Sequence, residues 1–189
     1  MAFQNLISRN LSGSKVLFIF ILTGIIYTAM LLITIPKVMD FSGGMKILDM
    51  MPTGYNSQYV TELFTALGSN GRDIYLYQQL PLDMIFPGIS AISFALVMAF
   101  LLKKLGKLES KWFYLSYLPF FGGLFDYFEN FSIIALLKSY PTIFETLVAF
   151  SATFSVLKAS FTTLYMTILI ILLLMLGFQK IFSKRIITG

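Results

Sequence analysis

The segment FDYFENF contains the residues of this chain that are best placed for chemistry. Asp126, Glu129 and Asn130 are spaced at i, i+3 and i+4, so a helix carries all three on one face. The surrounding residues are apolar, as in a membrane span, where a charge costs about 2.5 to 3.5 kcal/mol unless it is paired or meets water. This face should therefore point into the protein, and Lys158, on a later apolar segment, is its expected partner.

Further polar residues are expected near the same depth. Asp83 begins the second apolar run, and Arg72 and Tyr75 shortly precede it. Counted at about 1.5 Å per helical residue from the basic end of each segment, Asp83, Asp126 and Lys158 lie about 20 to 35 Å higher, in the outer third of a membrane. The inner two thirds of these segments hold no ionisable residue. We expect Asp83 to close the rim of a polar site, with Arg72 and Tyr75 approaching from a lid.

The composition narrows the chemistry of such a site. The chain has no histidine and no cysteine, which removes the usual base near neutral pH and thiolate or imidazole metal ligands. Carboxylates suit Mg²⁺ or Ca²⁺, but no ligand loop of recognisable spacing is present, so no metal site and no cofactor are expected. Ser155 and Lys158 have the spacing of a serine–lysine dyad without any supporting motif, and no catalytic residue is assigned.

The elements that must position these residues are membrane spans. Of the 189 residues, 57% are hydrophobic and 12% are charged, about half the charged share of ordinary soluble domains. A bilayer core needs about 20 apolar residues in a helix, and four runs are long enough: 16–36, 82–102, 112–137 and 146–178. The sequence predicts an all-α membrane protein, with residues 1–189 forming one membrane domain of four transmembrane helices. The last run is long enough that it must tilt or project.

Basic residues predict the orientation of these spans. They cluster in the N-terminal stretch, the second connection and the C-terminal tail: Arg9, Lys15, Lys103, Lys104, Lys107, Lys111, Lys180, Lys184 and Arg185. Lysine and arginine concentrate in short cytoplasmic segments, so both termini are predicted to be cytoplasmic, in a cell membrane. The net charge of +5 thus flanks the spans, and no nucleic-acid partner is expected.

The long outer connection, residues 37–81, is predicted to be ordered. Val60, Leu63, Phe64 and Leu67 follow the helical spacing of three and four after a capping residue, Ser57. Two short amphipathic helices on the outer surface fit this pattern best. Such a connection is either a packing lid for the bundle or a lid over a ligand site.

Three motifs resemble a family of small uncharacterised four-span membrane proteins from bacteria and fungi. They are LG-x-x-GR-x-x-Y-L in the outer connection, L-D near the start of the second span, and F-D-x-x-E-N in the third. The resemblance runs from residue 52 to about residue 165. It implies a shared site and carries no activity with it.

Three functions remain open at this point. The first is a carboxylate-lined cavity near the outer leaflet that binds a lipid or small amphiphile, and the sequence leaves open whether the protein is an enzyme that acts on it. The second is a non-catalytic subunit or assembly partner with a structural Asp/Glu–Lys network. The third is a proton-coupled carrier, which the apolar inner two thirds disfavour. Expected partners are membrane lipids, further copies of the chain or a larger membrane complex.

Overall fold

The computed structural model describes residue 7 and residues 11–187, with side chains as far as Ile181. Its described residues form helices and no strand. Four helical stretches are long and apolar enough to cross a membrane: Gly13–Met39, Ser57–Lys104, Lys111–Ser139 and Glu145–Ile181. The predicted all-α membrane class with four spans is confirmed. Among the basic residues used for orientation, Arg9 and the side chains of Lys184 and Arg185 lie outside the described part.

The first and second spans are each assembled from several helical elements. The elements in chain order are α2 (Gly13–Ala29), η1 (Met30–Thr34), α3 (Ile35–Met39), η2 (Leu48–Met50), α4 (Ser57–Ile74), η3 (Tyr75–Gln79), α5 (Leu80–Lys104), η4 (Lys111–Tyr117), α6 (Leu118–Ser139) and α7 (Glu145–Ile187). Of the two expected outer helices, only the first, α4 up to Gly68, stands apart. The second continues without interruption into the second span, so the non-helical part of the outer connection is shorter than 37–81.

Two π-helical turns occur at matching places before prolines. η1 ends two residues before Pro36, and η3 ends two residues before Pro81. Proline has no N–H to close an ordinary helical turn, and a π turn is a common local adjustment. The two turns contact each other, because the hydroxyl of Thr34 donates a hydrogen bond to Oε1 of Gln79. The two spans are therefore joined next to Pro36 and Pro81.

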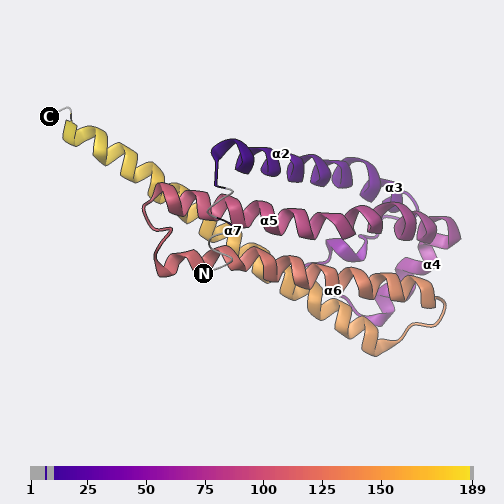
Figure 1. Cartoon of the computed structure of the whole chain (residues 1–189). Helices are drawn as coiled ribbons and strands as arrows, with labels where there is room; N and C mark the ends of the chain where they lie inside the picture. Colours follow the sequence, from indigo (N-terminus) through magenta and orange to yellow (C-terminus); the bar gives the residue numbers. More distant parts are fainter. Residues whose placement is uncertain (1–6, 8–10, 188–189) are drawn as a thin grey trace.

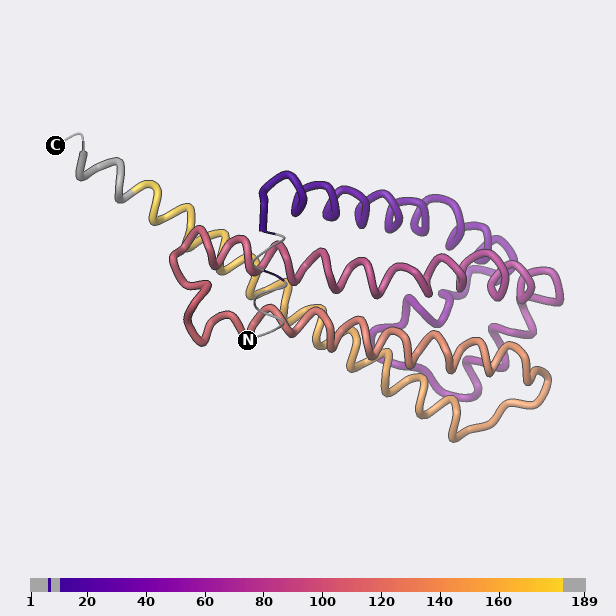
Figure 2. The backbone as a smooth tube through the Cα atoms, in the orientation of Figure 1, coloured from indigo at the N-terminus to yellow at the C-terminus, as the bar shows by residue number. Residues whose placement is uncertain are grey.

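The four spans are not arranged symmetrically. α5 packs against α2 on one side and α6 on the other, α6 runs along α7, and α5 also contacts α7. Figure 1 shows α2 at the edge of this arrangement, and Figure 2 shows the C-terminal part of α7 projecting beyond the other helices, as its length predicts. The outward faces of α2 and α7 carry large exposed apolar side chains, as lipid-facing surfaces do.

Glycines allow the three inner spans to approach closely. A Cβ atom on Gly123 of α6 would lie 2.9 Å from the carbonyl oxygen of Pro87 and 3.2 Å from Cβ of Ala91, both on α5. On the neighbouring Gly122 it would lie 3.3 Å from the ring of Tyr165 on α7. Small residues let membrane helices pack at short distance. This contact sets the spacing of the helices one turn below Asp126.

The connection 37–81, which we call the lid, is folded onto the end of the spans where α3 and α4 lie in Figure 1. The predicted stripe of α4 is completely or almost completely buried, with Val60, Leu63, Phe64 and Leu67 at 0 to 1% exposure. It packs in one apolar core with Ile47, Leu48, Ile133 and Leu136, among others. Full burial of one such side chain stabilises by about 1.5 to 3 kcal/mol, so the lid is a firmly packed part of the fold.

Candidate functional site

The centre of the polar site is an ion-paired lysine. Nζ of Lys158 on α7 lies 2.5 Å from Oε2 of Glu129 and 3.2 Å from Oδ1 of Asp126, both on α6. Glu129 is fully buried and Asp126 is 8% exposed. The pairing expected from the helical spacing is therefore present.

A second acidic side chain reaches this centre from α5. Nδ2 of Asn130 donates a 3.0 Å hydrogen bond to the backbone carbonyl of Asp83, which ties α6 to α5. The carboxyl of Asp83 is within electrostatic reach of Lys158, Asp126 and Glu129, and its Oδ2 atom is buried without a hydrogen-bond partner. The structure thus brings together Asp83, Asp126, Glu129, Asn130 and Lys158.

Asp49, which was not predicted from the sequence, belongs to the same group and comes from the lid. It lies on the short helix η2, and both of its carboxylate oxygens are buried without a hydrogen-bond partner. Burial raises the pKa of Asp49 to about 7, against the lowering effect of Lys158 and with a further raising effect from Glu129 and Asp126. The hydroxyl of Tyr75 is close enough to lower the pKa of Asp49 slightly, although the two groups do not meet the geometry of a hydrogen bond.

The raised pKa of Asp49 predicts a dependence of stability on pH. Its pKa rises from 3.8 to about 7, so the folded protein holds a proton that the unfolded chain releases. The contribution is fully present below about pH 4 and is lost as the pH rises through about 7. We expect Asp49→Asn to flatten this decline by on the order of 2 kcal/mol. This is less than the full pKa shift gives at about 1.4 kcal/mol per pKa unit, because the residue as a whole is only half-buried although its carboxylate oxygens are buried.

The measurement is the free energy of unfolding in detergent between pH 4 and pH 8. Asp40→Asn is the matched control, because Asp40 is an exposed acid of the same connection. Equal slopes for the wild type and Asp49→Asn would show that the carboxyl of Asp49 is not held in a buried environment.

The segment of the lid that includes Met51 and Tyr55 is fastened directly to α7. The hydroxyls of Tyr55 and Ser151 are 2.6 Å apart, and Oγ of Ser155 donates a 2.9 Å hydrogen bond to the carbonyl of Met51. Gly54 has φ +81° and lies against the backbone of Ala152, where a Cβ atom would be 3.4 Å from the carbonyl oxygen. Burial and the charge of Glu129 raise the pKa of Tyr55.

Ser155 and Lys158 do not form a serine–lysine dyad in the structure. The hydroxyl of Ser155 is committed to the carbonyl of Met51, and the amine of Lys158 is committed to two carboxylates. Neither group is arranged to activate the other. Ser151 and Ser155 instead hold the lid against α7 through hydrogen bonds.

The two lid residues predicted to approach the site differ in position. Tyr75 is completely buried and faces Asp49. Arg72 instead donates a 2.7 Å hydrogen bond to the carbonyl of Phe64, and its guanidinium lies 4.1 Å from the ring centroid of Tyr140. These contacts hold Arg72 within the packing of the lid, and neither is with the polar centre.

We refer to Asp49, Asp83, Asp126, Glu129 and Lys158 as the acidic cluster. Its main property is an excess of buried acceptor atoms over donors. The acceptors without a hydrogen-bond partner are both Oδ atoms of Asp49, Oδ2 of Asp83, Oε1 of Glu129 and, beside the cluster, Oδ1 of Asn130. A buried acceptor left unsatisfied costs about 1 to 3 kcal/mol. The cluster is therefore built to receive hydrogen-bond donors or positive charge.

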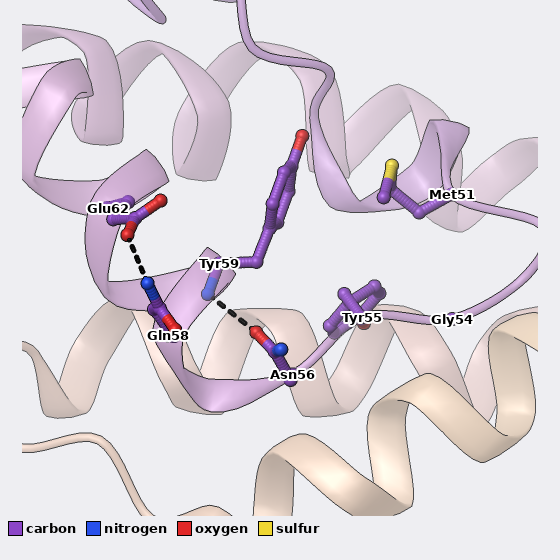
Figure 3. Close-up of a pocket in the computed structure, with 7 residues that line it drawn as sticks. All are labelled: Met51, Gly54, Tyr55, Asn56, Gln58, Tyr59 and Glu62. Carbon is purple, nitrogen blue, oxygen red and sulfur yellow. Dashed lines mark hydrogen bonds between the residues drawn. The ribbon is translucent and has the colours of Figure 1, made fainter.

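An open pocket of about 390 Å³ lies on the lid (Figure 3), and one of its lining residues, Tyr55, is within electrostatic reach of Glu129 and Asp49. Its lining consists of Met51, Gly54, Tyr55, Asn56, Gln58, Tyr59 and Glu62. The side chain of Glu62 accepts a 2.8 Å hydrogen bond from Gln58 at one side of the pocket, as drawn in Figure 3. Met51 and Tyr55 form part of its wall and are also hydrogen-bonded to Ser155 and Ser151 of α7.

Within the described residues, no group of three or more acidic side chains is close enough to hold a metal ion. The comparisons with protein-family models, curated proteins and solved structures find no match to this chain. The motif resemblance therefore stays a prediction.

Proposed function

We propose that this chain is a multi-pass protein of the cell membrane that binds a lipid or small amphiphile near the outer leaflet, with the polar head of the ligand at the acidic cluster. The observation that carries the proposal is the set of buried acceptor oxygens without donors, which belong to Asp49, Asp83, Glu129 and Asn130. A soluble, exposed acidic patch would satisfy such atoms with water. Buried at the outer end of four apolar helices, they favour a polar ligand.

The distribution of basic residues supports the orientation with both termini in the cytoplasm. Lys103 and Lys104 end α5, Lys111 begins η4, and Lys180 lies near the end of α7, all at the end of the bundle opposite the lid. Lysine-rich ends face the cytoplasm in most membrane proteins. The acidic cluster then lies toward the outer leaflet.

A purely structural network explains this arrangement less well. Hydrogen bonds between membrane helices contribute about 0.6 kcal/mol on average, and a single carboxylate would be enough to pair one lysine. The structure instead places four carboxyl groups within electrostatic reach of Lys158. Surplus buried acids destabilise a fold, and such a cost is typical of functional sites.

A proton-coupled carrier remains the second candidate because of two buried serines. Oγ of Ser93 on α5 and Oγ of Ser116 on η4 have no hydrogen-bond partner, and they lie further from the lid than Asp83. The inner half of the bundle is otherwise filled by an apolar core that includes Met98, Leu102 and Leu172. Two uncharged hydroxyls within this packing support conduction weakly, so binding is favoured.

The proposal is tested by native mass spectrometry with lipid analysis of the gently purified protein. We expect the wild type to retain a specific lipid or amphiphile and Glu129→Gln to lose it, since Glu129 lies at the buried centre of the cluster. Glu145→Gln is the matched control, because Glu145 is exposed in the first turn of α7. Circular dichroism and size-exclusion chromatography establish that each variant is folded.

Retention of one lipid class by the wild type and by Glu145→Gln, with loss from Glu129→Gln, supports the binding function. Equal and nonspecific lipid in all three proteins contradicts it and favours the structural network.

A further inference from the structure

We infer that the ligand of this site carries an ammonium group, or another cation that donates hydrogen bonds, and that it reaches the acidic cluster through the pocket beside Glu62. The inference rests on the proposed binding function and adds the chemical class of the ligand and its route. Three observations carry it: the charge balance of the cluster, the kind of atoms left unpaired, and the lining of the pocket.

The charge balance favours a cation. Asp126 and Glu129 share the one amine of Lys158. Asp83 and Asp49 form no ion pair in the described part of the chain, although both are within electrostatic reach of Lys158 and of the other acids. Any two of these carboxyl groups that are ionised together repel one another, and an added positive charge relieves the repulsion. An anionic head such as a phosphate would add to it.

The unpaired atoms indicate that the cation must also donate hydrogen bonds. Oδ2 of Asp83, Oδ1 of Asn130 and both Oδ atoms of Asp49 are buried and accept no hydrogen bond. Asp83 is 4% exposed and Asn130 is completely buried, so these are fixed interior groups. An ammonium group has three donors and no acceptor, so it can donate to as many as three of these four oxygens. Charge-assisted hydrogen bonds are roughly twice as strong as neutral ones.

The pocket provides a route of the same chemical character. Among its lining residues Glu62 is the only charged one, accompanied by the amides of Asn56 and Gln58. Figure 3 shows these three side chains around the pocket, with no lysine or arginine among the residues drawn. A cleft lined by one sign of charge attracts ligands of the opposite sign.

Tyr55 stands at the inner end of this route. It lines the pocket, its hydroxyl is 2.6 Å from that of Ser151, and it is within electrostatic reach of Glu129. Release of this hydrogen bond and of the Ser155–Met51 hydrogen bond would connect the pocket to the cluster. Both bonds are made by lid residues, so opening requires movement of the segment 51–55 and leaves the four spans in place.

The test uses the full chain in a neutral maltoside detergent and compares ligands that share one alkyl chain. The probes are dodecylamine, dodecanol and dodecyl phosphate, with butylamine as a water-soluble amine. Binding is measured by native mass spectrometry and by the shift in thermal stability. We expect dodecylamine to bind at least about ten-fold more tightly than dodecanol, because its head forms charge-assisted hydrogen bonds. Dodecyl phosphate should not bind.

Two variants and a control assign the binding to the cluster. Glu129→Gln and Asp83→Asn should each lose the preference for dodecylamine, and Asp73→Asn, at an exposed acid of α4, should keep it. Binding of butylamine as tight as that of dodecylamine would identify a free amine as the ligand source, and weaker binding an amphiphile. Either result supports the cation inference.

The two proposals can fail separately. If dodecanol or dodecyl phosphate binds as well as dodecylamine, and Glu129→Gln abolishes that binding, the cation inference is wrong and the binding function stands. If no probe binds in a manner that depends on Glu129 or Asp83, both proposals are wrong.

Discussion

Replacement of Lys158 by methionine is expected to destabilise the protein by about 3 to 5 kcal/mol, the usual cost of leaving a buried charge without its partner. The amine of Lys158 is the only one that pairs with Asp126 and Glu129 within the described residues. Methionine has a similar volume, so the loss is electrostatic and leaves no cavity. In a protein of ordinary stability this is a large share of the total free energy of unfolding.

The reason for the loss is tested by removing the charges that Lys158 balances. The triple variant Lys158→Met, Asp126→Asn, Glu129→Gln should regain most of the lost stability, because the side chains at these three positions are then all uncharged. Lys180→Met is the control, since Lys180 is exposed on the same helix. Unfolding in detergent, followed by circular dichroism, gives the four free energies. A triple variant as unstable as Lys158→Met would show that the lysine acts through packing and not through charge.

The spans and the centre of the site could be predicted because both depend on local spacing. Four apolar runs of sufficient length gave the four membrane helices, and the i, i+3, i+4 spacing placed Asp126, Glu129 and Asn130 on one inward face. Lys158 followed as the one cation of suitable depth on another span. Helix geometry converts sequence distance directly into spatial distance, so no tertiary information was needed.

The contribution of the lid could not be predicted in the same way. Asp49 lies on a three-residue helix in an irregular connection, where no periodicity tells which way a side chain points. Tyr55 and Met51 are bound to residues of α7 that are 96 and 104 positions away in the chain. Arg72 was expected at the site and is held by Phe64 and Tyr140 instead. Contacts of this range are decided by tertiary packing.

The extent of the second span was also set by more than hydropathy. The residues before Pro81 were predicted to belong to a second, separate outer helix, because the apolar run of the second span was placed at 82–102. In the structure the π turn η3 joins this helix to α5 without a break. The hydrogen bond between Thr34 and Gln79 stabilises the turn. Tyr75 is part of this turn, so the turn also determines that its side chain is buried next to Asp49.

Replacement of Asp83 by asparagine is the second change with a large expected effect, and it should act in opposite directions on stability and on binding. Oδ2 of Asp83 is a buried acceptor without a donor, in a cluster already rich in negative charge. Asparagine removes the charge and adds a donor of nearly the same shape. We expect the free energy of unfolding without ligand to rise by about 1 to 3 kcal/mol, the usual cost of an unsatisfied buried polar atom.

Ligand retention should fall in the same variant. In the proposed function the surplus acceptors bind the ligand, and a site that gives up stability for function becomes more stable when its function is removed. Asp73→Asn, the same change at an exposed position, should alter neither property.

The most direct test of the central claim is therefore the amount of specific lipid or amphiphile retained by purified Asp83→Asn, compared with the wild type in the same detergent. The proposed binding function predicts that a variant at least as stable as the wild type loses most of the bound ligand. Undiminished retention in a stable Asp83→Asn protein would contradict it, and would show that the acidic cluster holds the helices together without binding anything.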